Sequence, residues 1–321
     1  MTYVLGIDIG TTYSAAALAR HGRAEIAALG AISTAVPTAV YLLPDGGFLT
    51  AEEAIRRGAA DPDRLVLYFK RRLGDPVPLS VAGESYDPGV LLGEMLSWVR
   101  QRAVELEGGP PDEVVVTHPA NWGDYKKDLL ETAISNAGIY PFSLLTEPEA
   151  AAVHYSSQER TEVGSLIAVY DLGGGTFDAA LLRKTENRYD FVGEPLGVER
   201  LGGIDFDDLI WGHVVTTLGG SLGQIDLENP SNRRAVAALR RSMSEVKESL
   251  SSDSQVVVPV VLPGIDTEIR ITRAEFEGLI RPFLEDTLLA LQHLLDNAGV
   301  TTDDVNAVLL VGGSSRIPLV A

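Results

Sequence analysis

The sequence has no cysteine among its 321 residues, which excludes disulfide bonds, thiolate catalysis and metal sites built on cysteine. Positive charge is scarce, since 26 Lys and Arg stand against 45 Asp and Glu, and the net charge of -19 repels nucleic acid and anionic membranes. No apolar run approaches the roughly 18 residues that span a bilayer, and the first residues lack the features of a secretion signal. We therefore expect a cytoplasmic protein that binds neither nucleic acid nor membrane.

The residues that are present suit a folded protein of more than one domain. Hydrophobic residues make up 45% of the chain and charged residues 22%, and this length favours two ordinary domains or four smaller subdomains. Apolar periodicity predicts helices over 88–105, 125–137, 147–156, 233–250 and 273–297. We expect the last of these to break near Pro282. Gly108 to Pro111, Gly164 and the pair Gly202-Gly203 are candidate boundaries or hinges.

A glycine-rich turn occurs twice, as GIDIGTTYS at 6–14 and as DLGGGTFD at 171–178. The first follows an apolar run at 3–7 and precedes another at 14–19, and the second lies between runs at 165–170 and 177–182. Each copy therefore predicts strand, tight turn, strand. Further buried strands are expected at 114–117 and 307–311. The pattern predicts a mixed-sheet α/β unit made twice.

Consecutive glycines let backbone N–H groups point at one centre without interference from a Cβ, which makes a site for phosphate oxygens. The hydroxyls of Thr11, Thr12 and Thr176 would add donors, while Asp8 and Asp171 would suit Mg²⁺ through water ligands. One such turn alone would be an ordinary hairpin. Two copies with the same Asp before and Thr after favour a pair of half-sites that close on one triphosphate.

With these loops identified, the sequence resembles the nucleotide-binding domain of the seventy-kilodalton heat-shock protein chaperones of the DnaK type, within the actin-like ATPase superfamily. Six further segments carry the resemblance in order: YFKRRLG, VVVTHPANW, TEPEAAAVHY, LGGIDFD, SEVKESLSS and LLVGGSSRIP. It implies an actin-like ATPase fold of duplicated ribonuclease-H-like mixed sheets with flanking helices, in two lobes and four subdomains. Lobe I would be 1–163 (inner subdomain 1–36 and 110–163, outer 37–109), and lobe II 164–321 (inner 164–204 and 279–321, outer 205–278).

The resemblance also implies roles for single residues. The phosphate loops would be Gly10, Thr11, Thr12 and Tyr13, and Gly173, Gly174, Gly175 and Thr176. The catalytic set would be Lys70, Glu147, Asp171, Thr176 and Asp178, with Lys70 also contacting the nucleotide, and Asp8 and Asp171 would hold Mg²⁺ through water. The rest of the nucleotide would meet Gly202, Gly203, Ser244, Lys247, Glu248, Ser251, Gly312, Gly313, Ser314 and Arg316.

Several positions depart from the family pattern. Ser244 stands where many members carry a Glu that contacts the ribose, and Glu248 where some carry an Arg that packs on adenine. Lys127 replaces an interdomain Arg that acts with Pro119, and lysine lacks the bidentate fork of arginine. The resemblance ends at Ala321, before the family's last stretch of this domain, its linker and its peptide-binding region.

The function implied is slow hydrolysis of ATP to ADP, with Mg²⁺ and K⁺ as ions, in a monomeric chaperone switch for protein folding and stress response. The implied partners are a J-domain co-chaperone, a nucleotide-exchange factor and, where a C-terminal region exists, peptide clients. Two alternatives stay open at this point. A small-molecule kinase of the same superfamily would pass the phosphoryl group to an acceptor other than water. A filament-forming or nucleotide-sensing actin-like protein would use the same pocket without chaperone activity.

Overall fold

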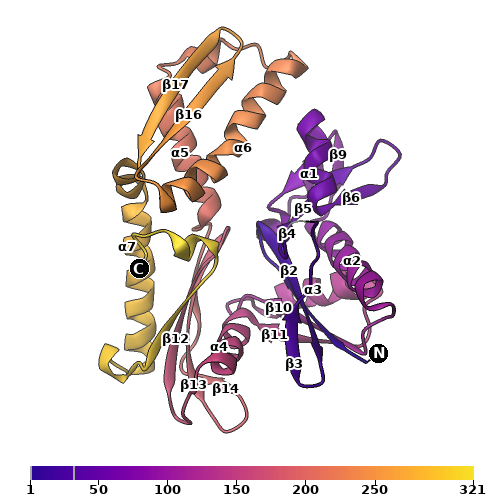
Figure 1. Cartoon of the computed structure of the whole chain (residues 1–321), viewed down its shortest axis with the longest axis vertical. Helices are drawn as coiled ribbons and strands as arrows, with labels where there is room; N and C mark the ends of the chain where they lie inside the picture. The colour runs from indigo at the N-terminus through magenta and orange to yellow at the C-terminus, as the bar shows by residue number, and fades with distance from the viewer. Residues whose placement is uncertain (1, 32) are drawn as a thin grey trace.

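A computed structural model describes residues 2–31 and 33–321 of the chain; Met1 and Ile32, both within the expected inner subdomain 1–36, lie outside the described residues. Figure 1 shows two halves side by side, each with a sheet in its lower part and a smaller α/β region above it. The chain ends lie on different halves, and helix α4 (Glu147–Gln158) lies between the two lower sheets. The subdomain boundaries given above stay predictions.

The first sheet holds the amino-terminal glycine turn. Its strands run in the order β11-β10-β1-β2-β3, with β4 also paired to β2. Their bounds are β1 (Val4–Ile9), β2 (Tyr13–Arg20), β3 (Arg23–Ile26), β4 (Val36–Pro37), β10 (Glu113–His118) and β11 (Phe142–Thr146). The hairpin β1-β2 is antiparallel, whereas β10 runs parallel to β1. The predicted strand, turn, strand is thus confirmed here.

The second sheet repeats this plan. It consists of β12 (Leu166–Leu172), β13 (Thr176–Lys184), β14 (Tyr189–Phe191), β15 (Leu196–Glu199) and β18 (Ala307–Val311). Again the hairpin β12-β13 is antiparallel and the third strand, β18, runs parallel to the first. The repeated motif of the sequence therefore corresponds to a repeated supersecondary unit, as predicted.

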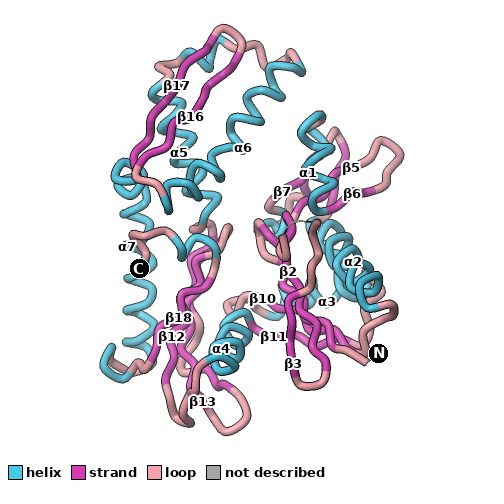
Figure 2. The backbone as a smooth tube through the Cα atoms, viewed as in Figure 1, coloured by secondary structure: helices cyan, strands magenta, loops and turns pink. Residues whose placement is uncertain are grey.

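Helices cover these sheets. Helix α2 (Pro88–Glu107) packs on β1 and on α3 (Asp124–Asn136) in the first half, while α7 (Arg273–Ala298) packs on β13 and β15 in the second. Figure 2 shows α7 as one continuous helix along the second sheet, and α4 contacts strands of both sheets. The structure thus supplies the five predicted helices, with ends shifted by a few residues at most.

The predicted break at Pro282 is wrong, because α7 runs through this residue. Proline removes the N–H that would bond the carbonyl of Gly278. Gly278 is exposed, so that carbonyl can bond water instead. Ile280 and Leu284, on either side of the proline, are both buried in the core and hold the two segments in one line.

The two upper regions are smaller. The first contains α1 (Ala51–Ala60), the sheet of β5 (Ala39–Leu42), β6 (Phe48–Thr50) and β7 (Leu65–Leu67), and the hairpin β8 (Leu79–Val81) and β9 (Glu84–Tyr86). The second contains α5 (Gly203–Thr217), α6 (Pro230–Ser252) and the hairpin β16 (Gln255–Leu262) and β17 (Ile265–Thr272). Short 3₁₀ turns complete the chain: η1 (Pro62–Arg64), η2 (Phe69–Arg72), η3 (Ser221–Gln224), η4 (Thr302–Asp304) and η5 (Gly313–Arg316).

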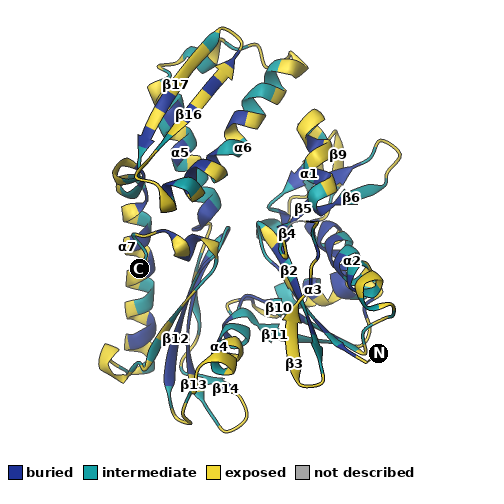
Figure 3. Cartoon of the chain, in the orientation of Figure 1, coloured by how far each residue is buried: buried dark blue, intermediate teal, exposed yellow. Residues whose placement is uncertain are grey.

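Each half has its own large hydrophobic core, one drawn from residues 3–139 and the other from 166–317. Figure 3 shows buried residues inside each half. On β1 the side chains of Leu5, Ile7 and Ile9 point into the first core, and burial of each contributes roughly 1.5–3 kcal/mol. Because strand side chains alternate, Asp8 is turned to the opposite, exposed face. The core packing thereby positions an acidic side chain at the end of the strand.

None of the helices among the described residues combines the length and the apolar composition needed to cross a membrane.

Candidate active site

A cavity of about 1150 Å³ lies between the two halves. Both glycine turns line it, together with η2, the start of α4, one face of α6 and the turn after β18. The predicted site residues on its wall are Asp8, Gly10, Thr11, Thr12, Tyr13, Lys70, Glu147, Asp171, Gly173, Gly174, Gly175, Thr176, Ser244, Lys247, Glu248, Ser251, Gly312, Gly313, Ser314 and Arg316. The fold thus brings together residues that are up to 308 positions apart.

Three predicted residues lie behind this wall. Asp178 is buried next to Thr176, whose hydroxyl donates to it over 2.9 Å. Gly202 and Gly203 support the second turn from below, since the N–H of Gly203 donates to the carbonyl of Gly173 over 3.0 Å. A Cβ on Gly202 would lie 2.8 Å from the backbone of Gly174. These residues shape the second turn and do not line the cavity.

The two turns touch each other. A Cβ on Gly174 would lie 2.0 Å from Thr12 Oγ1, and a Cβ on Gly175 would lie 2.7 Å from Thr11 Oγ1. Glycine is therefore required here by close approach of the other half, and not by the conformation of the turn. The same contact brings the two turns and the hydroxyls of Thr11 and Thr12 to one place, where the sequence predicts a phosphate site.

Gly174→Ala is expected to weaken nucleotide binding by about tenfold or more, because its methyl group would force Thr12 and the first turn away from the second. Isothermal titration with ATP measures this effect. Gly223→Ala is the matched control, because a Cβ at Gly223 would meet no atom within 4 Å. Equal affinities of the two variants would contradict the contact between the turns.

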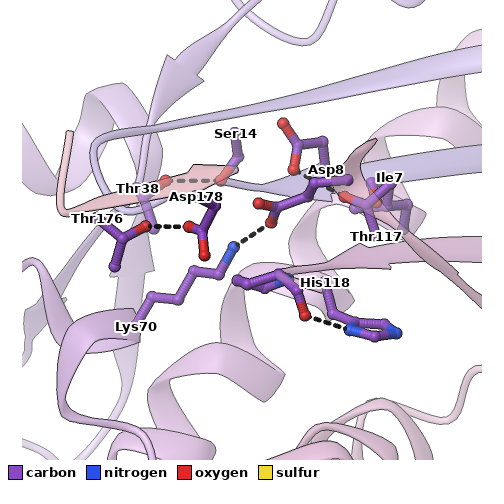
Figure 4. A network of polar contacts seen from close by, with 11 residues as sticks. Ile7, Asp8, Ser14, Thr38, Lys70, Thr117, His118, Thr176 and Asp178 are labelled. Atoms are coloured by element: carbon purple, nitrogen blue, oxygen red, sulfur yellow. Dashed lines mark hydrogen bonds and ion pairs between the residues drawn. The ribbon is translucent and has the colours of Figure 1, made fainter. Parts of the chain in front are cut away.

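Lys70 and Glu147 form a close pair of opposite charges in the cavity, beside both glycine turns. Lys70 is placed by η2 and Glu147 by the first turn of α4, and Nζ donates to Oε1 over 2.9 Å. The side chain of Lys70 is only 9% exposed, and its Nζ lies 5.6 Å from the centre of the Trp122 ring. Figure 4 shows Lys70 pointing toward the space between Asp8 and Asp178.

Negative charge exceeds positive charge around this lysine. Burial raises the pKa of Asp178 to about 7, and Glu147 adds to the rise, whereas the hydrogen bond from Thr176 opposes it. Burial, followed by Glu147 and Asp178, raises the pKa of Asp171 well above its usual range. Burial alone would lower the pKa of Lys70, but Glu147 and the neighbouring aspartates raise it overall. A further cation would balance this excess of carboxylates.

This excess charge fits the predicted Mg²⁺. Asp8 accepts a hydrogen bond from Thr117 Oγ1 over 2.8 Å, which leaves its other oxygen free to hold a water. Asp171 lies at the matching place on β12, and a Cβ on Gly312 would lie 2.6 Å from its Oδ1. Among residues 2–31 and 33–321 no three acidic or histidine side chains group closely enough to hold a metal directly. Binding through water by Asp8 and Asp171 does not need such a group of direct ligands.

The predicted adenosine residues line the part of the cavity wall formed by α6 and by the turn after β18. Lys247 on α6 is buried, and its Nζ donates to the carbonyl of Gly203 over 2.8 Å and lies 2.8 Å from Asp207 Oδ1. Ser314 donates to the carbonyl of Gly173 over 2.9 Å. Lys247 is thus held by an aspartate that the sequence analysis did not single out. The sequence signal for Asp207 is its short spacing from Gly203 at the start of α5, because this spacing places both residues beside α6.

Comparison with known proteins identifies the family of the chain. The family model described as Hsp70 protein matches residues 75–321. The chain belongs to the Hsp70 family. The chaperone protein HscA homolog of Methylibium petroleiphilum is 33% identical over 334 aligned residues, which cover 98% of this chain and 52% of that protein. The chain spans about half the length of this curated relative and corresponds to the nucleotide-binding domain of Hsp70. Members of this family are ATPases, so the match does not favour the kinase or the filament.

In this Hsp70 domain a residue that the sequence analysis missed joins the two halves. Arg71, next to Lys70, donates through Nη2 to both carboxylate oxygens of Asp205 at 3.1 Å. Asp205 also accepts the N–H of Gly202 over 2.9 Å at the start of α5. A basic run such as Lys70-Arg71-Arg72 normally indicates a solvated surface. Only the packing of the halves shows which of the three crosses the cleft.

Two further ion pairs join the halves. Lys126 of α3 lies 2.6 Å from Glu199 of β15, and Arg233 of α6 lies 3.3 Å from Asp63 of η1. Lys127, which stands in the place of the family's interdomain Arg, lies 3.6 Å from Asp124 on its own helix. Two of the ionic contacts between the halves of this Hsp70 domain therefore come from Arg71 and Lys126, which are the sequence neighbours of Lys70 and Lys127.

Arg71→Ala is expected to lower the free energy of unfolding by about 1–3 kcal/mol, because Asp205 is partly buried and would lose its counter-charge. Urea denaturation measures the change. Arg188→Ala is the matched control, since Arg188 pairs with Asp190 at 2.8 Å but is 78% exposed, and exposed pairs contribute only about 0–1 kcal/mol. A loss no larger than that of the control would mean that the contact between the halves adds nothing to stability.

Proposed function

We propose that this chain binds Mg-ATP in the cavity between its halves and hydrolyses it slowly, as the nucleotide-driven switch of a DnaK-type chaperone. The observation that carries the proposal is that both glycine turns and the Lys70 and Glu147 pair face one cavity. The turns offer N–H groups and hydroxyls to phosphates from two sides. Lys247, Ser251, Arg316 and their neighbours would then hold the adenosine.

In this proposal water attacks the γ-phosphoryl group in line with the leaving oxygen. Lys70 is kept in place by Glu147 and serves as a point charge beside the attacking water and the phosphoryl oxygens. Asp178 and Glu147 orient the water, and the pKa of about 7 suits Asp178 to accept its proton. Thr176 holds Asp178 and turns toward the phosphates. Mg²⁺, held through water by Asp8 and Asp171, supplies neutralisation of phosphate charge, with K⁺ as an additional ion.

The output of the reaction would be a change in the angle between the halves. We propose lobe I as 1–163 and lobe II as 164–321, with the outer subdomains at 37–109 and 205–278. A J-domain co-chaperone and a nucleotide-exchange factor would act on this domain in the cytoplasm, and it would work as a monomer. Binding of peptide clients would belong to a further region, as in the longer chaperones of the family.

Isothermal titration with ATP, ADP and GTP, paired with an assay of phosphate release, tests the proposal. We expect adenine nucleotides to bind and phosphate to appear slowly without any acceptor. GTP is included because Ser244 and Glu248 lie in the wall where family members differ. ADP formation only with an added acceptor would instead indicate a kinase, and light scattering that rises with protein concentration and ATP would indicate a filament.

A further inference from the structure

One oxygen of the buried Asp178 has no partner. Its side chain receives the hydroxyl of Thr176 on Oδ2, whereas Oδ1 is buried and accepts no hydrogen bond from any of the residues that the structure describes. The residue is only 5% exposed. A buried acceptor without a donor is costly, so such an atom calls for an explanation.

The space next to this oxygen is open because of a glycine. Gly197 on β15 lies directly opposite Asp178 on β13. A Cβ on Gly197 would lie 2.7 Å from Asp178 Oδ1 and 2.1 Å from Nδ2 of Asn121. The φ angle of Gly197 is not in the left-handed region, so its backbone does not require glycine. The close approach of these two side chains requires it.

Asn121 reaches this space from the other half of the molecule. It follows Pro119 in the loop between β10 and α3, is exposed, and lines the cavity. Its neighbour Trp122 lies under Lys70. On the same side, Lys126 of α3 is paired with Glu199, two residues after Gly197 on β15. This exposed ion pair brings the loop and the strand close together without fixing the distance between them.

The chemistry of an amide suits this place. A primary amide offers two N–H donors without adding charge. A hydrogen bond to the free oxygen would fix the orientation of the carboxylate and leave it able to accept a proton. A lysine here would pair with the carboxylate and compete with Lys70. A donor that comes from the opposite half is brought into range only when the halves close.

We propose that Asn121 is a positioning residue that donates from Nδ2 to Asp178 Oδ1 when the two halves close on the nucleotide. The proposal rests on the ATPase function argued above. Closure then orients the carboxylate to which the proposed mechanism gives the proton of the attacking water, so that the reaction is fast only in the closed state. Gly197 is the residue that permits this contact.

Steady-state and single-turnover hydrolysis by Asn121→Ala tests the proposal. We expect kcat to fall about tenfold while the KM for ATP stays within about twofold, since the contact acts on the reacting state and not on binding. Asn121→Asp, which has the same shape but no donor and a like charge, is expected to lose at least as much. Asn136→Ala, an exposed position at the end of α3, is the control. An unchanged kcat in Asn121→Ala, with wild-type hydrolysis intact, overturns the proposal.

A double-mutant cycle separates this role from general damage to the fold. Gly197→Ala alone is expected to lower kcat about as much as Asn121→Ala, because the methyl group would separate the two side chains. The combined variant is expected to lose clearly less than the product of the two single losses, because the contact between the side chains is already gone in Asn121→Ala. Some further loss remains, because the methyl group also lies 2.7 Å from Asp178 Oδ1. Losses that multiply in full would overturn the proposal, because they would show that the two positions act independently.

A crystal structure with a non-hydrolysable ATP analogue gives a readout besides activity. We expect Asn121 Nδ2 within about 3.2 Å of Asp178 Oδ1. A closed, nucleotide-bound structure in which the amide points elsewhere contradicts the inference but leaves the ATPase function in place. A wild-type chain that binds no nucleotide and releases no phosphate ends both.

Discussion

Lys70→Ala is expected to lower ATP turnover by about 100- to 1000-fold, the loss typical when a charged donor to the transition state is removed. Nucleotide binding should be retained, since the glycine turns and the α6 wall are untouched. Single-turnover phosphate release and isothermal titration measure the two effects separately. The structure gives the reason for so large a loss: Lys70 lies within hydrogen-bond distance of Glu147 and points at the space between Asp8 and Asp178.

The same substitution leaves Glu147 without its partner, so a loss of stability has to be separated from a loss of chemistry. Lys70→Met keeps the methylene stem near Trp122 and removes only the charge. Lys184→Ala, at the opposite end of β13 from Thr176, is the control for removal of a lysine as such. Undiminished turnover in Lys70→Met, with nucleotide binding intact, would contradict the role of the charge.

Asp178→Asn is expected to stabilise the nucleotide-free protein above pH 7 and to abolish most of its turnover. Burial raises the pKa of Asp178 to about 7, so the folded state binds its proton more tightly than the unfolded state does. Between about pH 4 and pH 7 the wild-type free energy of unfolding therefore falls as the pH rises. Since one pKa unit corresponds to about 1.4 kcal/mol, the gain from asparagine at pH 8 should reach at most about 4 kcal/mol.

Urea denaturation of the wild type and the variant at pH 8 and at pH 4 measures this gain. At pH 4 the folded wild type carries a protonated Asp178, so the difference between the two proteins should vanish. Asp128→Asn, on the exposed face of α3, removes a carboxylate of the same kind without burial. A gain that is the same at both pH values, or that Asp128→Asn reproduces, would show that the ionised carboxylate of Asp178 does not destabilise the folded protein.

The parts of the fold that could be predicted from the sequence are those with a local cause. The apolar runs around 6–14 and 171–178 alternate or run unbroken, and the glycines between them allow only a tight turn, so both hairpins follow from neighbouring residues. The prediction of a break at Pro282 was wrong because the helix is held there by contacts that are not local. The local cost of proline was outweighed by the packing of Ile280 and Leu284 in the second core, which no local rule contains.

In the site the same distinction holds. Asp8 and Asp171 could be placed because each stands at the end of a strand, beside a turn with a recognisable shape. This was not possible for Arg71, Asp207 and Asn121, because each lies against a residue on another element. Arg71 pairs with Asp205 across the cleft, Asp207 pairs with Lys247 on α6, and Asn121 lies against Gly197 on β15. The neighbours of Arg71 and Asn121 are determined by how the two halves meet, and the partner of Asp207 by how α5 packs against α6. A pattern of spacings along one chain carries no information about that meeting.

The separate cores of the two halves have a consequence for motion. The large core of each half lies within that half, a small apolar cluster packs α4 against the second sheet, and the ion pairs between the described residues of the two halves are Arg71 with Asp205, Lys126 with Glu199 and Arg233 with Asp63. Widening the cleft while α4 stays on the second sheet would therefore expose mainly charged groups to water and leave the two large cores buried, a change that water largely compensates. Dissolved ions would ease it further by screening the attraction. The angle between the two halves can therefore change at little cost in free energy. Ionic strength would shift the angle that the protein prefers.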